Sequence, residues 1–197
     1  MNINLLRLYP VWGKAFSWIT HNSKSLHLFY NNIESSYRLL ERCYSIKLTT
    51  VISDDNIMIL GLASLFRTYN YVENGNNYDN ASKGFLEFIN QTQLEINSDE
   101  VLRIIERSYT EQDFDSTGDL GLIFCDCVFL SKYDEDWISH VFYGYRLEKK
   151  MTMKETINEE LKLILNPPLS SEWARNEFTK ISSSLLVELD MFKKIII

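Results

Sequence analysis

The stretch from Leu60 to Tyr71 constrains the fold more than any other part of this chain. Apolar residues recur within it at helical spacing, with small residues between them: Leu62, Leu65, Phe66 and Tyr69. A helix that is apolar nearly all round is expected to be buried. The predicted helix ends on Arg67 and Thr68. Because a buried helix that ends on a charged and a polar residue usually lines a cavity, we expect a pocket at the end of this helix.

The composition predicts one globular domain. The chain has 197 residues, of which 45% are hydrophobic and 24% charged, with seven glycines and three prolines. This length can bury a sizeable core, and so few glycines and prolines leave little room for a linker. We therefore expect a single domain over residues 1–197, with an N-terminal helix (1–24) packed on it and a C-terminal helix (170–197).

Charge and hydropathy exclude several classes of partner. The net charge is −7 and the basic residues are dispersed, so the sequence offers no basic stripe for nucleic acid. It contains neither a signal-peptide pattern nor an apolar span long enough for a bilayer. The three cysteines cannot form a disulfide framework. These observations predict a cytoplasmic protein that binds neither nucleic acid nor membrane.

Every element that the pattern predicts is a helix, so the expected fold class is all-α. Asp54 or Asp55 is expected to cap the central helix, and two pairs resemble capping boxes: Asn97 with Glu100, and Thr152 with Glu155. The predicted helices cover residues 4–20, 26–43, 54–69, 80–92, 101–108, 120–132, 134–150, 152–165 and 172–194.

Five segments share their order with the motifs of one known family. They are Tyr30-Asn31-Asn32-Ile33-Glu34-Ser35, Phe66-Arg67-Thr68 with Tyr71, Asp79-Asn80, Phe124-Cys125-Asp126, and Arg146-Leu147-Glu148; Ala174-Arg175-Asn176 follows them. The set resembles the HD-domain metal-dependent phosphohydrolases. The resemblance implies an HD-like helical bundle and places the former metal-site positions at Asn31, Ser35, Arg67, Thr68 and Asp126.

The residues at these positions predict that the metal centre is lost. Serine and threonine are poor ligands for a divalent cation, and a guanidinium has no lone pair to give to one. Asp126 alone keeps a ligand of the expected kind. We therefore expect no metal and no cofactor, with the Arg67 cation paired to Asp126. The open alternative is a rewired metal site that uses His27 and Asp126.

Three functions remain open at this point. The leading expectation is a catalytically inactive, regulatory protein that acts through contacts with a protein partner, on a surface that Tyr143, Tyr145 and Trp173 would form if exposed. The second is a phosphohydrolase of nucleotides or phosphomonoesters with an altered ligand set. The third is a metal-free sensor of a phosphate-containing small molecule, with Arg67, Lys83 and Arg146 as the anion-binding residues.

Overall fold

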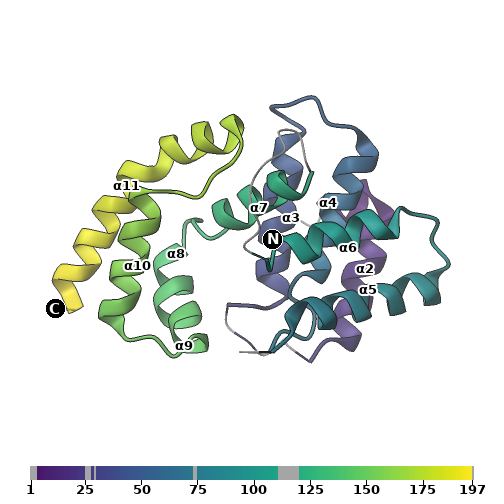
Figure 1. Ribbon diagram of the computed structural model, residues 1–197, viewed down its shortest axis with the longest axis horizontal. Helices are drawn as coiled ribbons and strands as arrows, with labels where there is room; N and C mark the ends of the chain where they lie inside the picture. The colour runs from purple at the N-terminus through teal and green to yellow at the C-terminus, as the bar shows by residue number, and fades with distance from the viewer. Residues whose placement is uncertain (1–3, 25–27, 29, 73–74, 111–119, 197) are drawn as a thin grey trace.

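Helices make up the regular structure of this protein, as the sequence predicts. The computed structural model describes residues 4–24, 28, 30–72, 75–110 and 120–196, and within these ranges no strand occurs (Figure 1). The first helices are α1 (Asn4–Leu8), α2 (Pro10–Asn22), α3 (Ile33–Ile46), α4 (Asp54–Phe66), α5 (Asn77–Thr92) and α6 (Ser98–Arg107). They are followed by α7 (Leu120–Leu130), α8 (Trp137–Ser139), the π-helix η1 (His140–Tyr145), α9 (Arg146–Glu148), α10 (Met153–Leu165) and α11 (Glu172–Ile196).

Helix α4 is the buried helix that the sequence predicts. Its side chains are buried on all faces from Ile59 to Phe66, and α2, α3 and α6 pack against it. Ser53 caps its N-terminus, with the Ser53 hydroxyl accepting from Asn56 N at 3.2 Å. The prediction of Asp54 or Asp55 as the cap is therefore wrong, since the cap lies one residue before Asp54. Both carboxylates lie in the first turn of α4, where their negative charge interacts favourably with the helix dipole.

A tryptophan and a glycine set how closely α2 approaches α4. The Trp12 ring is fully buried against Gly61, and its Nε1 donates to Met58 O at 3.1 Å. A Cβ atom at position 61 would lie 2.2 Å from Trp12 Cε2. Because no side chain fits in that space, glycine is required in the middle of this helix despite its cost in helix propensity.

The apolar side chains form two cores that share helix α7. The first core gathers residues from α1 to α7, and the second gathers residues from the end of α7 through α11. Phe124 and Cys127 of α7 belong to the first core, and Leu130 belongs to the second. Figure 1 accordingly shows α8 to α11 on one side, α2 to α6 on the other, and α7 between them.

Several predicted boundaries differ from the observed ones. Helix α3 begins at Ile33 rather than at residue 26, because Asn32 makes a capping box with Ser35; the predicted Ser25 cap lies outside the described residues. The single helix predicted over 134–150 is wrong, since this segment divides into α8, η1 and α9. The capping box of Thr152 with Glu155 is confirmed at the start of α10. At the start of α6, Asn97 is the N-cap and its side chain accepts from Glu100 N at 3.2 Å, but no bond from the Glu100 side chain back to Asn97 N completes a box. Among the described residues, no helix is both long and apolar enough to cross a membrane.

We expect the substitution Gly61→Ala to destabilise the protein by about 1–3 kcal/mol, because its Cβ would overlap the buried Trp12 ring. For a chain of this length, that loss lowers the unfolding temperature by about 2–4 °C per kcal/mol. Thermal unfolding followed by circular dichroism measures it. In a Trp12→Phe background the same substitution should cost less, because the smaller ring leaves room; equal costs in both backgrounds would contradict this account.

Candidate functional site

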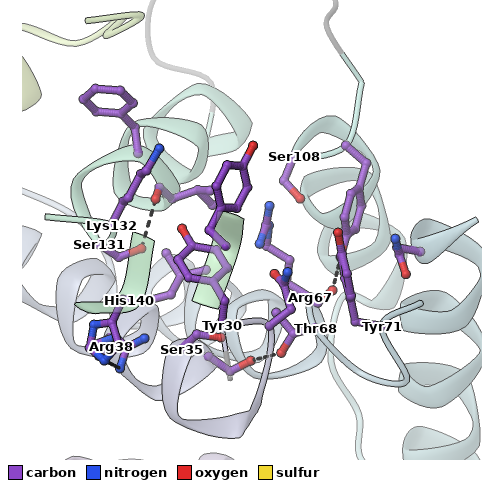
Figure 2. Close-up of a pocket in the computed structure, with 18 of the residues that line it drawn as sticks. Tyr30, Ser35, Arg38, Arg67, Thr68, Tyr71, Ser108, Ser131, Lys132 and His140 are labelled. Atoms are coloured by element: carbon purple, nitrogen blue, oxygen red, sulfur yellow. Dashed lines mark hydrogen bonds between the residues drawn. The ribbon is translucent and has the colours of Figure 1, made fainter. Parts of the chain in front are cut away.

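A cavity of about 440 Å³ lies between the two cores. Its walls come from α3, the turns that follow α4 and α6, and from α7, η1 and α10. Figure 2 shows Arg67 between two groups of side chains, with Tyr30, Lys132 and His140 on one side and Ser108 and Tyr71 on the other. The pocket expected at the end of the buried helix is therefore present.

Most of the positions that the resemblance singled out line this cavity. Asn31, Ser35, Arg67 and Thr68 do so, whereas Asp126 does not. Thr68 Oγ1 bonds to Ser36 Oγ at 2.5 Å and to Asn32 O at 3.1 Å, so its hydroxyl is already engaged in joining the α4 turn to α3. With one arginine and two hydroxyl groups, this donor set does not fit a divalent metal ion.

Arg67 is the C-cap residue of α4, and within the part of the chain that the structure describes it has no carboxylate partner. Its Nε is buried and has no hydrogen-bond partner, and no carboxylate of the described residues lies within 4 Å of its guanidinium. The guanidinium lies over the Tyr109 ring, 5.1 Å from the centroid, and the Tyr109 hydroxyl donates to Arg67 O. A stacked, half-buried cation with a buried Nε thus lines the cavity.

Asp126 does not pair with Arg67, so that prediction is wrong. Its carboxylate is fully buried; Oδ1 accepts from Ser170 N and Oδ2 from Ser171 N, each at 2.8 Å. These amides precede α11, where backbone N–H groups have no helical partner. Asp126 therefore joins α7 to the start of α11, and both of its oxygens are engaged away from the cavity.

The described residues contain no group of three or more metal-ligating side chains. This finding does not include His27, which lies outside the described residues. The rewired site of His27 and Asp126 therefore stays a prediction, although Asp126 would have to give up its two amide bonds to serve as a ligand.

Two further cations of the cavity wall are neutralised by their own carboxylates. Lys132 Nζ lies 2.5 Å from Glu160 Oε1, with about a tenth of the lysine side chain and none of the glutamate exposed. Burial raises the pKa of Glu160, and Lys132 opposes that rise. Arg38 Nε lies 3.1 Å from Asp134, which also contacts His140 Nδ1 at 3.2 Å.

The other two predicted anion-binding residues lie away from the cavity. Lys83 is exposed on α5, and Arg146 donates to Phe142 O at 2.8 Å and to Met151 O at 3.3 Å. Neither lines the cavity with Arg67. The neighbouring Glu148 accepts from Tyr30 N at 2.6 Å and from Asn31 Nδ2 at 2.8 Å. Within the Arg-x-Glu segment, Arg146 therefore hydrogen-bonds to backbone carbonyls of η1 and of the loop before α10, and Glu148 joins the segment to the chain before α3.

The sequence patterns assign no role in anion binding to four tyrosines and three cations that line the cavity: Tyr30, Tyr71, Tyr109, Tyr145, Arg38, Lys132 and Lys149. Tyr30 and Tyr71 belong to the motif segments, but no motif or spacing joins them to Tyr109, Lys132 and Lys149, which come from separate parts of the chain. Of the aromatic group expected on a partner surface, Tyr143 is exposed, Tyr145 lines the cavity, and Trp173 packs against both cores.

Three tyrosine hydroxyls of the cavity, those of Tyr30, Tyr109 and Tyr145, stay protonated at neutral pH. Burial raises the pKa of Tyr30, Tyr109 and Tyr145 above the ordinary value, and for Tyr30 and Tyr109 the charge of Arg67 opposes the rise only in part. These three side chains therefore present O–H donors and aromatic faces to the cavity rather than phenolates. They can contact an anion without adding negative charge of their own.

Comparisons with protein-family models, with curated proteins and with solved structures find no match. The site is therefore interpreted from its own residues.

We expect Asp126→Ala to destabilise the protein by about 2–4 kcal/mol, because it leaves Ser170 N and Ser171 N without an acceptor. Urea unfolding measures the loss, and Glu135→Ala, at an exposed carboxylate, serves as the control. Added manganese, nickel or zinc should stabilise neither wild type nor variant. Stabilisation of the wild type alone by one of these ions would instead make Asp126 a metal ligand.

Proposed function

We propose that this protein is a metal-free, non-catalytic binding protein for a phosphate-containing or similar small anion, with Arg67 as the primary ligand. The observation that carries the proposal is the buried Nε of Arg67, which has no partner and belongs to the wall of a 440 Å³ cavity. A volume of this size is typical of small-molecule sites.

The partial burial of the Arg67 cation supports an anionic ligand. A charged group taken out of water is costly unless it is paired or hydrogen-bonded. Lys132 and Arg38 meet this requirement within the protein, through Glu160 and Asp134. Arg67 lies over the face of Tyr109, and no carboxylate of the described residues pairs with it. An anion in the cavity supplies the missing partner, and the planar guanidinium suits a phosphate or carboxylate through two parallel hydrogen bonds.

The proposal includes an HD-like origin for this site. Asn31, Ser35, Arg67 and Thr68 follow the order of the family's motifs, and all four line the cavity. In this interpretation the charge of Arg67 stands where the family holds a metal ion, so anion binding is kept while hydrolysis is lost. A phosphohydrolase with an altered ligand set is the alternative, and it requires a metal ion.

A regulatory role through a protein partner is the remaining part of the proposal. Exposed apolar side chains recur every four residues along α11: Val187, Met191 and Ile195. Exposed apolar residues on one helix are typical of surfaces that bind other proteins. In this proposal, a protein partner that recognises the anion-bound state binds to this face of α11.

We expect inorganic phosphate to raise the unfolding temperature of the wild type, because a ligand of the folded state stabilises it by mass action. At 100 times the Kd the gain is about 2.7 kcal/mol, or about 5–10 °C for a chain of this length. Arg67→Gln should abolish this shift and Arg67→Lys should reduce it, since lysine keeps the charge but not the planar pair of donors. Differential scanning calorimetry measures both.

Sodium chloride at matched ionic strength controls for general salt effects, and Lys83→Gln removes an exposed lysine outside the cavity. That control variant should respond to phosphate as the wild type does. An equal phosphate response in wild type and Arg67→Gln would contradict the proposal. Near-stoichiometric metal in protein purified without chelator would favour the phosphohydrolase instead.

A further inference from the structure

We infer that the ligand of this cavity carries two separated anionic groups, one bound by Arg67 and the other by Lys149, so that it bridges the two cores. The inference rests on the proposed function, because it assumes that Arg67 binds an anion. It adds the ligand class and a second binding residue, which the family motifs do not mark.

The two residues belong to opposite sides of the cavity. Arg67 follows α4, whose side chains lie in the first core. Lys149 follows α9, which packs against η1, and Val141 and Phe142 of η1 belong to the second core. Both line the cavity. A ligand held by both therefore spans the space between the cores.

Arg67 and Lys149 differ from the other cations of the cavity in having no ion pair among the described residues. Arg38 and His140 contact Asp134, and Lys132 contacts Glu160. Among the described residues, no carboxylate lies within 4 Å of Arg67 or of Lys149. The two cations without an internal counter-charge thus lie on opposite walls of one cavity.

One carboxylate, that of Glu159, lines the same cavity as Lys149 and disfavours a highly negative ligand group near it. Glu159 lines the cavity and accepts a long hydrogen bond of 3.5 Å from the Tyr145 hydroxyl. Its charge repels an anion bound by Lys149. Removing the Glu159 charge should therefore strengthen binding of an anionic group by Lys149, whereas removing the Lys149 charge should weaken it.

The size and chemistry of the cavity support a ligand with an apolar body between its charges. At about 30 Å³ for each water, 440 Å³ corresponds to about fifteen waters, far more than a single oxyanion fills. Besides the two cations, the walls carry aromatic and aliphatic side chains, including Tyr30, Phe129 and Leu163. Such walls gain contact with a hydrocarbon or ring linker and disfavour charge along its length.

Isothermal titration calorimetry with alkane bisphosphonates of increasing linker length tests the inference, with inorganic phosphate as the single-anion reference. We expect one linker length to bind the wild type about tenfold more tightly than phosphate, because both cations then form charge-assisted hydrogen bonds. Lys149→Gln should remove this gain, so that the bisphosphonate binds this variant no more tightly than phosphate does. Glu159→Gln should strengthen binding of the same bisphosphonate.

The matched control is Lys154→Gln, at an exposed lysine on α10 that does not line the cavity; it should bind every probe as the wild type does. Two results would overturn the inference: bisphosphonates that bind no more tightly than phosphate, or an equal loss in Lys149→Gln and Lys154→Gln. Failure of the proposed function looks different, since then no anion binds in a way that depends on Arg67. Circular dichroism establishes that each variant folds.

Discussion

Burial of α4 on all of its faces is the constraint on which the rest of the structure depends. A helix without a polar face must be covered by neighbours all round, and here α2, α3 and α6 supply the cover. Gly61 lets the Trp12 ring lie directly on the helix backbone. With its neighbours held so closely, the turn after Phe66 has a fixed place, and Arg67 enters the space between the two cores.

Three polar contacts hold the two cores on either side of that space. Glu148 binds the chain before α3, Arg38 of α3 binds Asp134, and Asp126 of α7 binds the amides before α11. Each is partly or fully buried, where hydrogen bonds to charged groups contribute more than on the surface. They also engage the carboxylates of Glu148, Asp134 and Asp126, so none of these three pairs with Arg67. Among the described residues, the same contacts that define the cavity therefore leave Arg67 without a carboxylate within 4 Å.

The local features of the fold were predictable because they depend on neighbouring residues. The all-α class follows from helical periodicity, and the Thr152 to Glu155 capping box needs only residues within one turn. Prediction failed where distant residues decide. The segment 134–150 has an unbroken helical pattern, yet it divides around the π-helix His140–Tyr145, where Asp134 and Arg38 contact His140. π-helical turns occur frequently at functional sites, and this one contributes His140 and Tyr145 to the cavity.

The sequence by itself determined the helical class, the buried helix α4 and the position of Arg67 at its end, since periodicity and residue type are properties of short segments. Tertiary structure alone decided which charges meet. Asp126 has a charge suited to Arg67, but its two oxygens bind the Ser170 and Ser171 amides instead. Lys149 lies 82 positions after Arg67 in the sequence, yet both line one cavity. Chain packing sets such distances, and charge pairing depends steeply on distance and burial.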